Sequence, residues 1–228
     1  MYRYIIRFEK TGKIRYISHL DLMRLFHRAF KRSEIALNYS KGFNPHPKMS
    51  FAQPLSLGFM SVGEYLEFET IDSFDCEILT EKLNAMLPHG VTIIKCRSLQ
   101  PGKKTVGSTV DWARYEIIFK GEFGNEIYEM TDKYLEQKQI PVMKRQKKDG
   151  KMKETDIKPL ISEFSIAEHG KDQVKFMALI RAGSAANLNP ELLMKAFCEY
   201  MNCPYEDEKF TYIRLDLYDK DMNPLVSD

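Results

Sequence analysis

The chain has 228 residues, of which 43% are hydrophobic and 29% are charged, and its formal net charge is +2. This length is enough for one large domain or for two domains of about 100 residues each. No run of 18 apolar residues occurs, which excludes a membrane-spanning helix, and the opening MYRYIIRFEKTGK is too charged for a secretory signal. We therefore expect a cytoplasmic protein.

Basic residues gather in two stretches of the sequence. Residues 1–60 hold eleven Lys and Arg against three acidic residues, and residues 141–160 hold seven against three. This segregation predicts an electropositive face and hence an anionic partner. The alternative is that the charges scatter over a solvated surface once the chain has folded.

The first half of the chain alternates strand and helix patterns. RYIIRFEK (3–10) alternates polar and apolar residues, as a half-buried strand does. A helix is predicted after Ser18, where Asp21 completes an N-terminal capping arrangement. Two extended segments, KMSFAQPLSLG and GEYLEFETI, then precede a second helix in CEILTEKLNAMLP and a closing strand in VTIIKCRSL.

The second half repeats this order. RYEIIFKG (114–121) resembles the opening strand, and a helix is expected from about Asn125. Two extended segments follow, KETDIKPLISEFSIAEHG and QVKFMALIRAG, joined by a turn at 169–172. Asn189 and Pro190 then mark the start of the helix NPELLMKAFCEYMN, and FTYIRLDLY closes the half as a strand.

The order β-α-β-β-α-β, found twice, predicts an α+β fold of two tandem ferredoxin-like halves with antiparallel sheets. The expected division is an N-terminal domain at 1–100, a linker at 101–112 and a C-terminal domain at 113–228. A basic stretch at 144–155 reads as a weakly structured loop or hairpin tip. A single continuous α+β domain is the alternative.

No cofactor or metal is predicted. The four cysteines form no CxxC pair, and their pattern favours free thiols in a reducing compartment. The chain contains no GxGxxG, GxxxxGK[ST], HExxH or GxSxG motif, so nucleotide-cradling loops and these catalytic motifs are absent from the sequence.

The loop SKGFNPHPK, at 40–48, carries the strongest local signal. Pro45 and Pro47 fix their own φ angles and hold Asn44 and His46 extended, which stiffens the loop. We expect Phe43 to anchor the loop in the core. A stiff connector and a binding rim are both open readings, and the basic and aromatic neighbours favour a binding rim.

Two histidines are weak catalytic candidates. Cleavage of a phosphodiester by acid–base chemistry needs two groups on opposite sides of the reacting atoms, and His19 and His46 are the residue types required. Lys48 or Arg15 could stabilise the negative charge that develops. A histidine in the first turn of a helix is more often a surface residue, so the sequence favours a protein that is not an enzyme.

We expect a nucleic-acid interface to include residues of both basic stretches. The residues from the first half can form one site only if the fold brings them together. The predicted nucleic-acid-binding residues are Lys13, Arg15, Tyr16, His19, Arg24, Lys41, Asn44, His46, Lys48, Lys144, Arg145, Lys147 and Lys148.

Five motifs together span nearly the whole chain: RYISHLD, YSKGFNPHP, SFAQPLSLG with EY beyond it, TDIKPLI and RAGSAANLNPELLMKAF. In these motifs the chain resembles the bacterial family of radical-SAM-linked proteins. Members of this family are fused to, or encoded beside, B12-binding radical-SAM proteins. Since this chain lacks a cysteine triad, the resemblance implies an accessory module with a radical-SAM protein as its partner.

Three functions remain open at this point. The preferred one is a non-catalytic module that binds RNA or a ribonucleoprotein substrate for a radical-SAM partner. The first alternative is a protein-interaction scaffold without nucleic acid, and the second is a metal-independent ribonuclease that uses His19 and His46.

Overall fold

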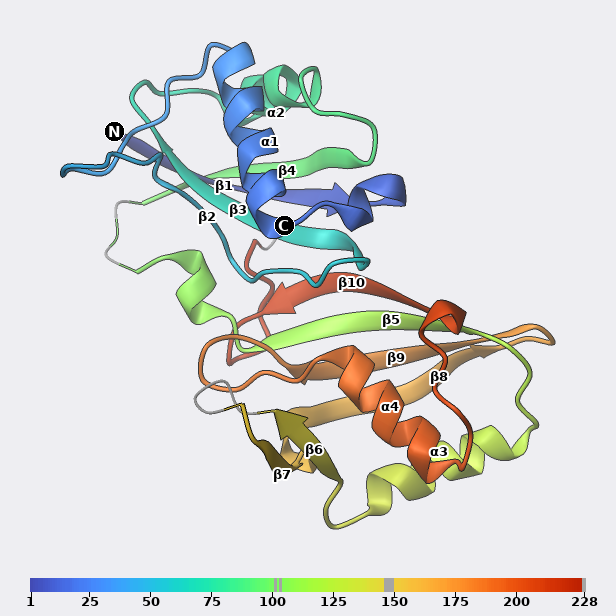
Figure 1. Cartoon of the computed structure of the whole chain (residues 1–228). Helices are drawn as coiled ribbons and strands as arrows, with labels where there is room; N and C mark the ends of the chain where they lie inside the picture. Colours follow the sequence, from blue (N-terminus) through green and yellow to red (C-terminus); the bar gives the residue numbers. More distant parts are fainter. Residues whose placement is uncertain (101, 103, 146–149, 227–228) are drawn as a thin grey trace. The chain divides into compact units, whose positions relative to one another are not determined.

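The computed structural model of the chain describes residues 1–100, 102, 104–145 and 150–226 (Figure 1). In these residues the fold is mixed α/β, with four α-helices and mostly antiparallel strands. The chain divides into two units, one made of Met1–Asp111 with Arg214–Asp228 and the other of Trp112–Ile213. The second unit thus starts at the end of the predicted linker, whereas the last residues group with the first unit and not with the second half.

Strand β1 (Tyr2–Lys10) lies in the middle of the first unit. Its residues Tyr4, Ile6 and Phe8 alternate along the strand and are buried in the hydrophobic core. The strand pairs antiparallel with β3 (Met60–Thr70) on one side and with β4 (Val91–Leu99) on the other. The short strand β2 (Met49–Phe51) pairs with β3, and β3 also neighbours β10 (Phe210–Tyr218), which reaches this unit from Arg214 onward.

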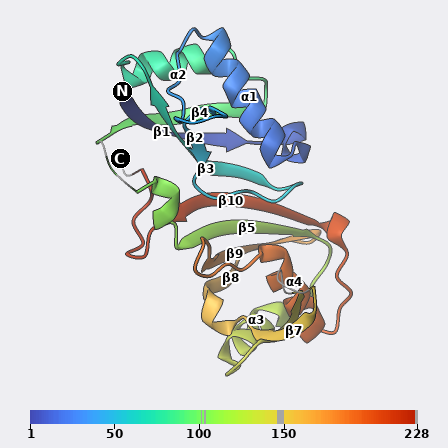
Figure 2. The ribbon, with the colours of Figure 1, turned by 60° about the vertical axis from the view of Figure 1, so that its left-hand side comes forward.

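Two helices cover one face of these strands, as Figures 1 and 2 both show. The 3₁₀ turn η1 (Gly12–Tyr16) leads from β1 to α1 (His19–Arg32), and α2 (Cys76–Asn84) leads from β3 to β4. The Ser18 hydroxyl accepts a bond from the Asp21 N–H, so the predicted cap of α1 is present. The buried side of α1 presents Leu22, Phe26, Ala29 and Phe30 to the core.

The second unit begins with β5 (Trp112–Lys120) and α3 (Glu126–Glu136). Strands β8 (Ile161–His169) and β9 (Gln173–Arg181), helix α4 (Pro190–Tyr200) and the first residues of β10 complete it, and its strand order is β10-β5-β9-β8. Both helices lie on one face of these strands (Figures 1 and 2). Phe197 of α4 packs edge-on against Phe164 and Phe176 of the sheet.

The basic stretch at 144–155, predicted to be a weakly structured loop or a hairpin tip, overlaps two paired strands at its ends. Strands β6 (Pro141–Arg145) and β7 (Met152–Asp156) pair antiparallel in a separate two-stranded sheet. A 3₁₀ turn, η3 (Lys158–Leu160), then divides β7 from β8, so the extended segment expected at 153–170 is not continuous. The expectation of one continuous segment was wrong because Pro159 in this turn has no backbone N–H to donate to a strand ladder.

Among the described residues no helix is long and apolar enough to cross a membrane. The part of the chain that the structure describes also holds no group of three or more His, Cys, Asp or Glu side chains placed to bind a metal ion.

Candidate nucleic-acid interface

The loop between α1 and β2 forms a narrow hairpin that is held by its own hydrogen bonds. Tyr39 pairs with Pro47 in an antiparallel bridge, and the Ser40 N–H donates to the His46 carbonyl (2.9 Å). The Ser40 hydroxyl accepts a bond from the His46 N–H (3.1 Å) and lies 2.9 Å from Nδ1 of the same residue. Because its two prolines also fix φ, this hairpin has little conformational freedom to lose when it binds a partner.

The tip of the hairpin, residues 41–44, is exposed, and Phe43 stands out at its end. Its relative exposure is 111%, so the expectation that this ring anchors the loop in the core is wrong. The reason is the hairpin itself, which pairs Tyr39 with Pro47 and so carries the tip away from the sheet. Gly42 has φ +135°, a backbone conformation that L residues rarely adopt, and this allows the sharp turn before the ring.

At the base of the hairpin, Lys48 is fixed against the edge of the sheet. Its ammonium lies 2.8 Å from Oε2 of Glu69, and the Asn38 amide donates to the same oxygen (2.6 Å). Partial burial would raise the pKa of Glu69, but the hydrogen bonds from Lys48 and Asn38 hold it below its usual range. The charge of Lys48 is therefore largely compensated, whereas Lys41 at the tip has no ion-pair partner among the described residues.

A groove of about 570 Å³ lies behind the hairpin, at the C-terminal half of α1. Nε2 of His27 lies 3.0 Å from the Tyr39 hydroxyl at its edge, and Lys31 contributes a positive charge. Phe30, Ile35 and Leu37 supply apolar lining. The groove thus combines an apolar floor with polar groups at the rim, a composition common in ligand sites.

The other predicted residues of the first half surround η1 and the start of α1. The Arg15 guanidinium lies over the Tyr16 ring, 4.7 Å from its centroid, and donates to its hydroxyl (2.6 Å). His19 packs edge-on against Phe51, with ring centroids 5.2 Å apart. Arg24 pairs with Asp21 at 3.0 Å, and Lys13 is exposed.

Arg15 and Lys48 lie near opposite ends of β1. Lys48 contacts Glu69, which pairs with Arg3 near the start of the strand, whereas the Arg15 carbonyl accepts a bond from Lys10 at its end. Arg3 and Lys10 are seven residues apart, which corresponds to about 23 Å along a strand. In Figure 1 the hairpin projects beside the N-terminus, and η1 lies beyond the other end of β1.

Arg15 and Lys48 therefore do not converge on one site. His19 packs against Phe51, whereas His46 is bonded to Ser40 within the hairpin, so no contact of this structure joins the two histidines into a pair acting on one phosphodiester.

The third predicted group belongs to the second unit. Lys144 donates to the Asn187 carbonyl at 3.2 Å. Lys147, Lys148 and the side chain of Arg145 lie outside the described residues. The hairpin 39–48 is consequently the best-defined part of the predicted interface.

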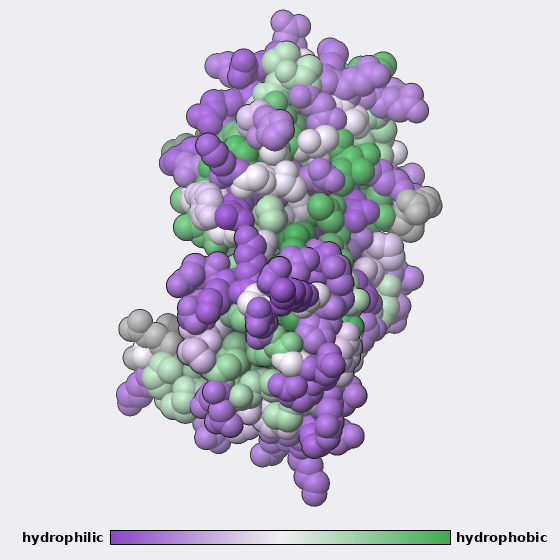
Figure 3. Space-filling model, turned by 90° about the vertical axis from the view of Figure 1, so that its right-hand side faces the viewer, coloured by the Kyte–Doolittle hydropathy of each residue, from purple (hydrophilic) through white to green (hydrophobic). Residues whose placement is uncertain are grey.

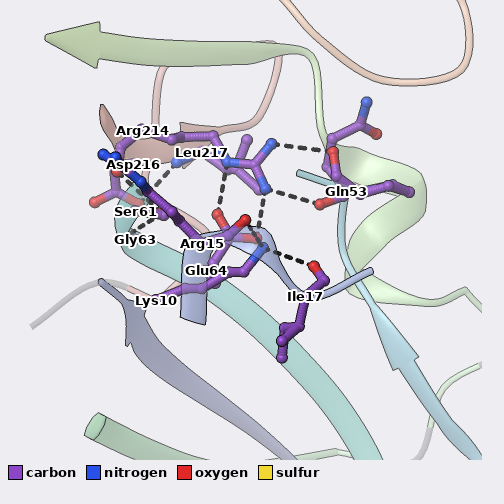
Figure 4. Close-up of polar contacts among 11 residues, drawn as sticks. Lys10, Arg15, Ile17, Gln53, Ser61, Gly63, Glu64, Arg214, Asp216 and Leu217 are labelled. Carbon is purple, nitrogen blue, oxygen red and sulfur yellow. Dashed lines mark hydrogen bonds and ion pairs between the residues drawn. The ribbon is translucent and has the colours of Figure 1, made fainter. Parts of the chain in front are cut away.

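Sequence reasoning missed a buried charge cluster beneath η1 (Figure 4). Arg214 and Glu64 form a bidentate pair at 2.7 and 2.5 Å, with side-chain exposures of only 1% and 3%. Lys10, itself 2% exposed, donates to the carbonyls of Arg15 and Ile17, both at 3.3 Å. Burial lowers the pKa of Lys10, an effect that the nearby Glu64 carboxylate opposes.

The sequence and the fold can now be compared with known proteins. The chain belongs to the family described as "Uncharacterized protein conserved in bacteria (DUF2344)", whose model matches residues 3–190. No curated protein matches it.

Two solved structures show limited similarity. A chain of a Cbf5-Nop10-Gar1 complex matches at 8% identity and a TM-score of 0.49, over 94% of this chain and 48% of that one. This protein therefore spans about half the length of that relative. A protein described as a proposed glycine cleavage system transcriptional repressor matches at 12% identity and a TM-score of 0.24, over 93% and 98% of the two chains.

Proposed function

We propose that this protein is a non-catalytic accessory module that binds RNA, alone or within a ribonucleoprotein, through the hairpin 39–48. The observation that carries the proposal is the fully exposed ring of Phe43 on a hairpin stiffened by its own hydrogen bonds. The ring buries no apolar surface within the chain, so its whole face is available to a partner.

The chemistry of the tip suits single-stranded RNA. Aromatic rings stack on unpaired bases, and each such contact is worth about 1–3 kcal/mol. Lys41 lies two residues from the ring and offers a charge for the adjoining phosphate. Asn44 offers an amide, and the groove at His27 and Tyr39 lies at the foot of the same hairpin.

The wider setting of the proposal rests on the family motifs. The resemblance to radical-SAM-linked proteins supports a radical-SAM protein as the partner and the cytoplasm as the place of action. Under this proposal the chain presents RNA to the radical-SAM partner and holds no cofactor of its own.

The fold that we propose for each unit is ferredoxin-like. In the first unit β4-β1-β3-β2 pair in this order, and in the second unit the order is β10-β5-β9-β8. Both orders agree with the split βαβ connection.

The proposal is tested by titrating labelled single-stranded RNA of roughly 20 nucleotides, longer than the site of one small binding domain, and following its fluorescence anisotropy. Phe43→Ala should weaken binding about 5- to 150-fold, which corresponds to the loss of one stacked base. The matched control is Tyr128→Ala, since Tyr128 is an exposed aromatic residue of the second unit. For the wild type, the logarithm of the affinity should fall linearly with the logarithm of the salt concentration.

Equal RNA binding by the Phe43→Ala and wild-type proteins would overturn the proposal, as would the absence of RNA binding at low salt. RNA cleavage that is lost in both His19→Ala and His46→Ala would instead favour the ribonuclease alternative.

A further inference from the structure

The buried charge cluster holds two surface segments from beneath. Lys10 donates to the carbonyls of Arg15 and Ile17, on either side of Tyr16. Arg214 donates to the Gln53 carbonyl at 2.8 Å and to the Pro54 carbonyl at 3.4 Å (Figure 4). Burying these charges costs free energy. Their hydrogen bonds fix the backbone at η1 and in the loop 52–58.

The two segments are also joined to each other at the surface. The Gly58 N–H donates to the Arg15 carbonyl at 2.9 Å. Gly58 has φ +84°, and a side chain at this position would meet the Tyr16 ring at 4.0 Å. The loop and the turn therefore form one continuous support, which is fixed before any partner binds.

Two large apolar side chains are exposed on this support, and a third is exposed at the start of α1. Tyr16 of η1 is 60% exposed, Leu57 of the loop 63%, and Leu20 in the first turn of α1 65%. Figure 3 looks onto the side on which η1 lies in Figure 1, and hydrophobic surface is visible there among hydrophilic side chains. We call Tyr16, Leu20 and Leu57 the apolar anchors.

Positive charge continues from the anchors along α1. Arg24, Arg28 and Arg32 follow Leu20 at intervals of four residues, so they lie along one side of the helix, and all three are exposed. Arg24 pairs with Asp21, whereas Arg28 and Arg32 have no ion-pair partner in the described residues. An exposed apolar group beside uncompensated cations is complementary to an acidic segment with apolar side chains.

We propose that the apolar anchors and the arginines of α1 form a docking surface for an acidic, amphipathic segment of a partner protein. This inference is independent of the hairpin 39–48, which lies at the other end of β1. RNA fits this face less well because two of the three anchors are leucines, which do not stack on bases. In addition, Arg15 and Arg24 already bind groups within the chain.

The test is a display selection of random peptides on the immobilised full-length chain, followed by affinity measurements on the enriched sequences. The selected peptides should combine Asp or Glu with spaced leucines or aromatic residues. Combining Leu20→Ser with Leu57→Ser should weaken their binding about tenfold or more, as expected for central apolar contacts. Arg28→Glu should weaken it about two- to fivefold.

Two controls separate this inference from the proposed RNA site. Phe43→Ala should leave peptide binding unchanged, and the Leu20→Ser and Leu57→Ser double variant should leave RNA binding unchanged. The melting temperature of the double variant checks its folding, since both side chains are exposed and their replacement should affect stability little.

The inference is wrong if the enriched peptides are not acidic, or if they bind the double variant as tightly as the wild type. It is also wrong if the double variant loses affinity for the RNA probe, because this face would then bind nucleic acid.

Discussion

The two ends of β1 carry exposed surfaces that are built in different ways. Above its base, the hairpin 39–48 is held by contacts between residues at most ten positions apart, such as Ser40 with His46 and Asn38 with Lys48. The surface at η1 is held by charges brought together from β1, β3 and β10, with Glu64 and Arg214 separated by 150 positions. A locally held loop can change at little cost to the fold, whereas the η1 surface depends on the integrity of the whole unit.

The largest expected effect comes from breaking the buried pair. Glu64→Ala should lower the free energy of unfolding by about 3–5 kcal/mol, because it leaves the Arg214 charge buried without its carboxylate. Chemical denaturation measures this loss. The double variant Glu64→Leu with Arg214→Met should recover much of the stability, since apolar replacement of a buried pair is often neutral. A loss below about 1 kcal/mol in Glu64→Ala would contradict the role we assign to the pair.

A smaller effect is expected from crowding the strand that carries Glu64. A Cβ atom at Gly63 would lie 2.2 Å from the backbone oxygen of Leu215, so Gly63→Ala must push β3 and β10 apart. We expect the free energy of unfolding to fall by about 1–3 kcal/mol, as measured by thermal or chemical denaturation. The matched control is Gly170→Ala, where the nearest atom is 3.4 Å away and a loss of similar size would count against the packing argument.

A substitution in the hairpin should lower the free energy of unfolding by less than the two changes above. Ser40→Ala removes the hydroxyl that bonds to the His46 backbone and ring, and should cost about 0.5–1.5 kcal/mol or less. Amide hydrogen exchange at His46 should accelerate while exchange in β1 stays unchanged. RNA affinity should also fall, although Phe43 is still present, because the tip is then less ordered. Unchanged exchange at His46 would show that Ser40 does not brace the loop.

The smallest effect is a pH dependence at the base of the hairpin. The pKa of Glu69 is lowered in the folded protein, so the ionised carboxylate contributes stability above its unfolded pKa of about 4.3. This contribution is lost as the pH falls through the folded pKa. The wild type should therefore lose more stability than Glu69→Gln on acidification below that unfolded pKa, as measured by urea denaturation. Parallel curves for the two proteins would exclude a role for this carboxylate.

Local features of the fold could be predicted from the sequence, because they depend on residues that are close in the chain. The cap formed by Ser18 and Asp21 and the start of α4 at Asn189 and Pro190 are examples. The exposure of Phe43 could not be predicted, because a loop has no hydrophobic periodicity by which a buried ring can be told from an exposed one.

The arrangement of the site could not be predicted in the same way. Arg15 and Lys48 are 33 positions apart and were expected to lie together, but the intervening chain runs the length of α1 and returns at the far end of β1. The cluster of Lys10, Glu64 and Arg214 left no sequence signal, since each residue alone reads as a surface charge in a strand. These three residues come together only because β1, β3 and β10, which are far apart in the sequence, are neighbours in the sheet.

The return of β10 to the first unit has a consequence for synthesis on the ribosome. Glu64 and Lys10 emerge early, but Arg214 is made 150 residues after Glu64. At elongation rates of about 5–20 residues per second, synthesis of the chain from Glu64 to Arg214 takes roughly 8–30 s. During that interval the nascent first unit lacks the Arg214 partner of Glu64, so the η1 surface becomes fixed only after residue 214 has been made.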